Sequence, residues 1–146
     1  MLKRILVVCI GNICRSPMAA ALLDASLAGD ASVSSAGIGA MVGSPADIVA
    51  VELMEERGLD ITAHVARQLD ENLLRDSDVV VTMDSEQVKW IEKHWPQSCG
   101  RVYRWGHWGD FDVPDPYRRG DRAFRDALEL ILDGLDDWST RLRQIT

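Results

Sequence analysis

The sequence RILVVCIGNICRSP, from Arg4 to Pro17, decides how this chain folds. Residues 4–8 are rich in apolar, β-branched side chains without polar alternation, which predicts a strand buried on both faces. Ser16 and Pro17 are typical of a helix N-cap followed by a first-turn proline. The stretch therefore predicts a strand, a short loop and a helix in immediate succession.

The same alternation of strands and helices continues along the chain. Further strands are expected at residues 31–36, 78–83 and 101–105. Helices are expected over residues 18–27, from Ser44-Pro45 to Gly58, after residue 83 through about Lys93, and from near Asp121 onward. The last helix places its large apolar side chains on one face: Phe124, Leu128, Ile131, Leu135 and Trp138. This order predicts an α/β fold, a parallel sheet covered by helices on both faces.

Length and composition indicate one globular domain, residues 1–146. Of the 146 residues, 47% are hydrophobic and 27% charged, which suits a packed core rather than a disordered or membrane chain. The N-terminal apolar run, residues 5–10, is too short for a signal peptide or a membrane span. A net charge of -7 argues against a general nucleic-acid surface. We therefore expect a cytoplasmic protein without nucleic-acid binding or membrane insertion.

Neither a disulfide framework nor a metal site is predicted. The cysteines are odd in number, which suits a reducing compartment: Cys9, Cys14 and Cys99. The histidines lie far apart, and none has zinc-finger spacing to a cysteine: His64, His94 and His107. We expect no metal and no cofactor.

Cys9 and Arg15 bracket a loop between the first strand and the first helix. Backbone N–H groups of such a loop converge on an anion, and the helix N-terminus adds its positive dipole end. Gly11 and Asn12 tolerate the left-handed backbone that a tight curve requires. The same donors would stabilise a Cys9 thiolate, and the planar Arg15 fork pairs with two phosphoryl oxygens. The loop therefore predicts a phosphate site with its own nucleophile, and Ser16 could also donate to the thiolate.

The structural alternative makes Cys9 a small buried side chain at a strand end and Arg15 a surface charge. The complete string from Cys9 to Pro17 favours catalysis, because its Gly, Asn, Arg, Ser and Pro all stand where phosphate binding needs them.

A thiolate that attacks phosphorus needs an acid to protonate the departing oxygen. The candidate is Asp115, which Pro114 and Pro116 flank and stiffen. Its segment follows the fourth expected strand, so it lies at the same end of the sheet as Cys9. An ordinary Asp-Pro turn is the alternative.

These motifs resemble the low-molecular-weight protein tyrosine phosphatases over nearly the whole chain. The family's loop, C-x-G-N-x-C-R-S-P, is met from Cys9 to Pro17, and its Asp-Pro-Tyr motif at residues 115–117. Residues 34–37, 64–69 and Met83-Asp84 also resemble family segments. The stretch Gly106-His107-Trp108 most resembles bacterial members paired with tyrosine autokinases of exopolysaccharide export.

The resemblance implies a flavodoxin-like, doubly wound sheet of four parallel strands and a two-step hydrolysis of phosphotyrosine. Cys9 takes the phosphoryl group, while Asp115 first protonates the phenolate and then activates water. Residues implied to contact the substrate are Ile10, Gly11, Asn12, Ile13, Cys14, Ser16, Met41 and Tyr117. Residues implied to support the loop are Ser35, His64 and Asp84, together with Asn12 and Ser16.

The chain also departs from the family's pattern. Ala20 stands where many members carry a Glu that supports the loop, and Arg118 where animal members have a second Tyr. A pocket-wall aromatic of animal members is replaced by Met41 or a neighbour, and Met41 could equally be an ordinary loop residue.

Other functions use the same fold. Arsenate reduction needs a relay of further thiols, whereas Cys99 is the only late cysteine. Phosphoarginine phosphatases tend to have Thr where Ile13 stands, and Ile13 suits an aromatic ring better. A catalytically silent phosphoprotein-binding module would need neither Cys9 nor Asp115.

Cys14 has two interpretations. It packs beneath the loop as a small side chain, or it guards Cys9 by forming a disulfide after oxidation, since the loop's curl brings the two side chains near each other.

Overall fold

Four parallel strands form a single sheet in the computed structural model, which describes residues 3–145. The strands are β1 (Lys3–Cys9), β2 (Ala31–Gly37), β3 (Val79–Thr82) and β4 (Val102–Arg104). Their order in the sheet is β2-β1-β3-β4, and every pairing is parallel. The predicted strands are thus confirmed, and the order is that of a flavodoxin-like sheet.

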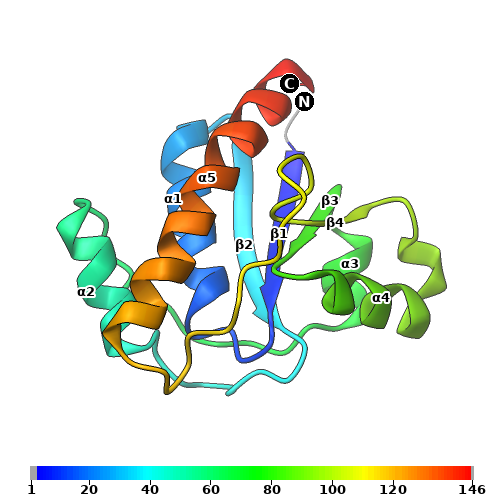
Figure 1. Cartoon of the computed structure of the whole chain (residues 1–146). Coiled ribbons are helices and arrows are strands. Elements are labelled where there is room, and N and C mark those ends of the chain that lie inside the picture. The colour runs from blue at the N-terminus through cyan, green and yellow to red at the C-terminus, as the bar shows by residue number, and fades with distance from the viewer. Residues whose placement is uncertain (1–2, 146) are drawn as a thin grey trace.

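Helices cover both faces of this sheet (Figure 1). They are α1 (Arg15–Leu27), α2 (Ile48–Glu56), α3 (Glu71–Arg75), α4 (Ser85–His94) and α5 (Asp121–Ile145), with a 3₁₀ turn at Pro96–Ser98. Helices α1, α2 and α5 lie on one side of the sheet, and α3 and α4 lie on the other. No helix of the described residues is both long and apolar enough to cross a membrane.

Residues 5–9 of strand β1 are apolar because this part of the strand is buried on both faces. Ile5, Val7 and Cys9 face the core under α1 and α5, whereas Leu6 and Val8 face the core under α3 and α4. Cys9 therefore lies at the end of a fully packed strand, on the side of the larger core.

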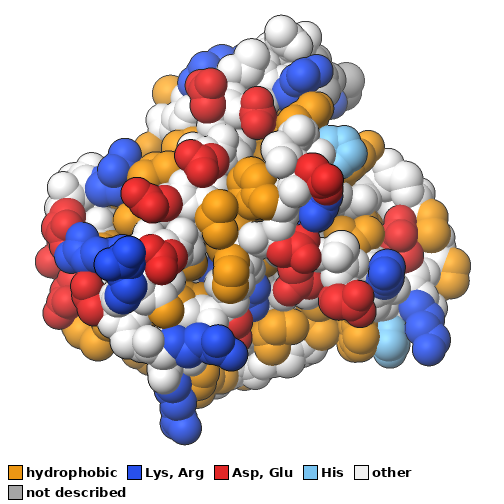
Figure 2. All heavy atoms as spheres, in the orientation of Figure 1, with side chains coloured by type: hydrophobic (Ala, Val, Ile, Leu, Met, Phe, Trp, Pro, Cys, Tyr) orange, Lys and Arg blue, Asp and Glu red, His pale blue; other side chains and the backbone are white. Residues whose placement is uncertain are grey.

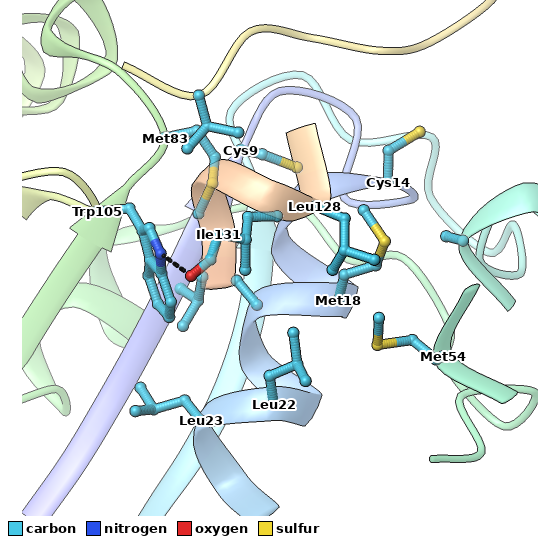
Figure 3. Close-up of a cluster of buried hydrophobic side chains, with 14 of the residues drawn as sticks. Cys9, Cys14, Met18, Leu22, Leu23, Met54, Met83, Trp105, Leu128 and Ile131 are labelled. Carbon is cyan, nitrogen blue, oxygen red and sulfur yellow. Dashed lines mark hydrogen bonds between the residues drawn. The ribbon is translucent and has the colours of Figure 1, made fainter. Parts of the chain in front are cut away.

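Trp105 anchors α5 against the end of the sheet (Figure 3). Its indole Nε1 donates to the Ile131 carbonyl over 2.8 Å, and its own carbonyl accepts from Trp138 Nε1 over 2.8 Å. Gly134 makes this possible, because a Cβ at that position would collide with the indole ring. The predicted apolar face of α5 is confirmed, with Phe124, Ile131 and Trp138 buried.

Two local predictions were wrong, and one short helix was missed. Helix α1 begins at Arg15 with Cys14 at its N-cap, so Ser16 does not cap it. Helix α2 begins at Ile48 rather than at Ser44-Pro45, because the Asp47 side chain accepts from Val49 N and caps the helix there. The five-residue helix α3 was not expected.

Candidate active site

The loop between β1 and α1 lies where the sheet reverses its strand order. β1 ends at Cys9 with β2 on one side and β3 on the other, and the loop begins at its carboxyl end. Close packing with β2 depends on Gly37, since a Cβ there would collide with the Ile10 carbonyl. The loop and the residues around it meet at the lower edge of the molecule in Figure 1.

Cys9 is 2% exposed, and its sulfur has two close polar neighbours. Its Sγ lies 2.9 Å from Ser16 Oγ, and the backbone N–H of Asn12 donates to it over 3.3 Å. These are the partners that a thiolate requires. Ser16 therefore faces the sulfur instead of capping the helix.

Asn12 ties the loop to its surroundings. It adopts the predicted left-handed backbone, with φ of 59°, and is fully buried. Its Nδ2 donates to Ser16 Oγ over 2.8 Å and to Ser35 Oγ over 3.0 Å, while its Oδ1 accepts from Arg67 N over 2.9 Å. One side chain thus joins α1, β2 and the segment after α2.

His64 and Arg67 complete this bracing network from outside the loop. His64 Nε2 lies 2.7 Å from the Asn12 carbonyl, and Arg67 Nε donates to the Ser35 carbonyl over 2.9 Å. Arg67 was missed as a functional candidate, because its role depends on a backbone N–H that only the folded chain brings to Asn12.

Arg15 links the phosphate loop to the loop that contains Asp115. It is 2% exposed, and its Nη1 donates to the Val113 carbonyl over 2.8 Å. Its guanidinium also lies 3.8 Å from Asp84 Oδ2 and 3.9 Å from Asp115 Oδ2. Asp84 at the same time caps α4 by accepting from Gln87 N over 2.8 Å. Arg15 is therefore buried and oriented, not a surface charge.

Asp115 stands on the exposed side of this arrangement. Its side chain is half exposed, and its Oδ1 accepts from Tyr117 N over 3.1 Å. The loop is anchored just before it, where Val113 N donates to the Met83 carbonyl at the end of β3 over 2.8 Å. The carboxylate thus stands over the pocket mouth on a loop fixed at its base.

Both loops border a pocket of about 150 Å³. It is lined by Cys9, Ile10, Gly11, Ile13, Cys14, Arg15, Gly39, Met41, Asp115 and Tyr117. Of the expected substrate contacts, Asn12 and Ser16 lie outside this lining, because their side chains point into the bracing network. Gly39 was not predicted. A larger open groove of about 670 Å³ is lined in part by His64 and Ser35. Cys9, Arg15 and Asp115 do not line it.

The sequence matches the model of a known protein family. Residues 4–145 match the family model "Low molecular weight phosphotyrosine protein phosphatase". The chain belongs to this family.

Similar proteins include bacterial members of the family. The chain is 51% identical to the probable low-molecular-weight protein-tyrosine-phosphatase EpsP of Ralstonia nicotianae over 99% of each chain. It is 37% identical to the phosphatase Wzb of Escherichia coli K12 over 97% of each chain. The structure superposes with a TM-score of 0.91 on Vibrio vulnificus Wzb in complex with benzylphosphonate, at 35% identity and covering 95% of this chain and 98% of that one.

An arginine phosphatase shares the fold as well. YwlE from Geobacillus stearothermophilus superposes with a TM-score of 0.91 at 31% identity, covering 97% of this chain and 94% of that one. Fold similarity alone therefore does not separate phosphotyrosine from phosphoarginine, and the pocket side chains have to do so.

In this phosphatase, Cys14 differs from Cys9 in its surroundings. It is 4% exposed, and burial raises the pKa of its thiol strongly, with the Asp47 carboxylate acting in the same direction. Cys14 is therefore a neutral thiol at neutral pH. Within residues 3–145, no group of three His, Cys, Asp or Glu side chains is placed to hold a metal ion.

Proposed function

We propose that this phosphatase hydrolyses phosphotyrosine through a cysteinyl-phosphate formed on Cys9. The observation that carries the proposal is the convergence of Cys9, Arg15 and Asp115 on one narrow pocket. The apolar Ile13 side chain and the aromatic ring of Tyr117 line the same pocket and suit an aromatic ring of the substrate.

The first step transfers the phosphoryl group. The Cys9 thiolate forms an S–P bond as the P–O bond to the phenol breaks, and Asp115 gives its proton to the departing oxygen. Arg15 pairs with two phosphoryl oxygens throughout, since its fork matches their geometry. Its buried hydrogen bond to the Val113 carbonyl holds that fork in place beforehand.

The second step releases phosphate. The Asp115 carboxylate accepts a proton from water, the oxygen forms a bond to phosphorus, and the S–P bond breaks. The electron pair returns to Cys9, where the Ser16 hydroxyl at 2.9 Å stabilises it. In the proposed reaction, four residues act as positioning residues, because they hold Cys9 and Arg15 rather than touch the ester: Asn12, Ser35, His64 and Asp84.

Phosphoarginine hydrolysis is the second candidate, favoured by the structural similarity to YwlE. Two matched peptides, one with phosphotyrosine and one with phosphoarginine at the same position, separate the candidates. We expect kcat/KM to favour the phosphotyrosine peptide, because Ile13 offers an apolar wall. A higher kcat/KM for phosphoarginine would overturn the assignment.

Arsenate reduction has less support. Cys99 precedes β4, whereas Cys9 ends β1, and because the strands are parallel the two thiols lie at opposite ends of the sheet. Thiol relay between them is out of reach. A phosphatase assay with and without arsenate tests this directly.

We further propose that the substrate is a tyrosine autokinase of exopolysaccharide production, and that the enzyme works in the cytoplasm as one domain. The support is the 51% identity to EpsP and the resemblance at Gly106-His107-Trp108. Incubating the purified enzyme with the phosphorylated kinase domain of such an autokinase, and following phosphotyrosine by mass spectrometry, tests the pairing.

A further inference from the structure

The two walls of the pocket mouth differ in charge. One is formed by Met41, which is apolar and 41% exposed, and continues in the chain into Val42, which is apolar and 69% exposed. The other continues from Tyr117 into Arg118 and Arg119, both exposed. Figure 2 shows blue Lys and Arg side chains projecting at the lower edge, near the end of the loop that leads into α5.

The arginine pair stands without acidic partners. Within the described part of the chain, neither guanidinium forms an ion pair, although the protein carries a net charge of -7. The next acids along the chain are already engaged, because Asp121 pairs with Arg125 at 2.8 Å and Asp126 pairs with Arg122 at 3.1 Å. Two positive charges are thus left for a partner.

The backbone holds Arg118 beside the pocket wall. Its φ is 59°, a left-handed conformation that is uncommon for a residue other than glycine. The turn is closed by Arg119 N donating to the Pro116 carbonyl over 3.0 Å. In this conformation the Arg118 guanidinium lies 5.2 Å from the centre of the Tyr117 ring, which itself lines the pocket.

We propose that Arg118 and Arg119 bind the carboxylates of an acidic segment next to the phosphotyrosine. The inference rests on the proposed function, because the phosphotyrosine must occupy the pocket for its neighbours to reach this wall. A peptide that crosses the mouth meets arginines on one side and apolar Met41 and Val42 on the other. Acidic residues therefore help on only one side of the phosphotyrosine.

Three matched phosphotyrosine peptides test this: one with two Glu before the phosphotyrosine, one with two Glu after it, and one with Gln at all four places. We expect kcat/KM of one acidic peptide to exceed that of the Gln peptide about three- to tenfold, the scale of two exposed ion pairs. The gain shrinks as NaCl is raised from about 20 mM to about 0.5 M.

The double variant R118Q/R119Q removes both charges and should bring that ratio to about one. Arg122→Gln is the matched control, because Arg122 is exposed, lies on α5 and already pairs with Asp126; the ratio should persist. Equal kcat/KM for all three peptides in the wild type, an unchanged ratio in the double variant, or an equal gain from both acidic peptides would overturn the inference. Turnover of the Gln peptide tests the proposed hydrolysis of phosphotyrosine independently of the two arginines. If the wild type does not hydrolyse this peptide, the proposed function fails rather than the inference about acidic segments.

Discussion

Residues 9–16, which contain Cys9, and residues 114–120, which contain Asp115, border one pocket and are held in different ways. Most of the first segment is buried, and Asn12 donates a hydrogen bond to Ser35 of β2 and is bonded to His64 and Arg67 of the segment after α2. Among residues 3–145, the backbone hydrogen bonds of the second segment belong to local turns, and Asp115 forms an ion pair with Arg15 outside the segment.

This difference separates two tasks. The nucleophile and the phosphate-binding N–H groups have to be fixed before the substrate arrives, because their value lies in geometry that needs no reorganisation. The acid has to follow leaving groups of different shape, and the exposed carboxylate of Asp115, which follows the anchor at Val113, suits that task. Arg15 connects the two segments, and a bound phosphate would compete with Asp115 for its guanidinium.

Replacing Cys9 with Ser should have the largest effect. The hydroxyl keeps the shape of the braced loop but is a far weaker nucleophile, so we expect turnover to fall by at least about 10⁴-fold. Vanadate or phosphate binding, measured by calorimetry, should remain close to wild type. Substantial residual kcat in a clean Cys9→Ser preparation would rule Cys9 out as the nucleophile.

Arg15→Lys tests the connection between the two segments. We expect a loss on the order of 10³ in kcat/KM, nearly as large as for Arg15→Ala. An ammonium cannot donate to the Val113 carbonyl and to two phosphoryl oxygens together. Steady-state kinetics of both variants measure this loss. Near wild-type kcat/KM in the Lys variant would show that a positive charge alone is sufficient at this position.

Asp115→Asn tests the exposed segment. We expect kcat to fall about 10²- to 10⁴-fold, the usual scale for a lost general acid. The loss should shrink for aryl phosphates with more acidic phenols, since a good leaving group needs less protonation. A loss that is the same for poor and good leaving groups would assign Asp115 a structural role.

The sequence predicted residues 9–16 well, but it predicted the contacts that hold this segment in place only in part. The apolar run of β1, the left-handed Asn12 and the position of Arg15 follow from local chemistry, because strand burial and backbone conformation are local preferences. The partners Arg67 and the Val113 carbonyl do not, since tertiary packing alone places them. The cap at Ser16 was mispredicted because its hydroxyl is taken by Cys9 and Asn12. Helix α3 was missed because five residues are too few for a periodic signal.

Asn12→Gly probes how much the bracing contributes. Glycine accepts φ of 59° without strain, so in the folded state the variant removes only the side-chain bonds. Leaving buried partners such as Ser35 Oγ without a hydrogen bond should lower the free energy of unfolding by about 1–3 kcal/mol. We also expect kcat to fall by about tenfold. Ser35→Ala, which removes one of these bonds, is the matched control and should cost less in both measurements.

Denaturant unfolding and steady-state kinetics of the two variants give the comparison. Wild-type kcat in Asn12→Gly, with stability lowered, would show that the bracing serves folding alone and does not position Cys9.

Cys14→Ser should change turnover least, within about threefold, because the Cys14 side chain belongs to neither step of the hydrolysis. Its effect should appear after oxidation. Peroxide converts the Cys9 thiolate to a sulfenic acid, and the Cys14 thiol then condenses with it to form a disulfide and release water. Reductant restores both thiols, so the wild type should recover activity while Cys14→Ser is progressively lost to further oxidation.

The surroundings of Cys14 set the pH dependence of this protection. Because burial and Asp47 raise the pKa of Cys14, its reactive thiolate is scarce at neutral pH and increases as the pH rises. Formation of the disulfide should therefore accelerate from about pH 7 to about pH 9, while iodoacetamide labels Cys14 slowly at neutral pH. Mass spectrometry of the peroxide-treated wild type should find the Cys9–Cys14 link. Equal recovery of both proteins, or absence of the link, would leave Cys14 as a packing residue beneath the braced loop.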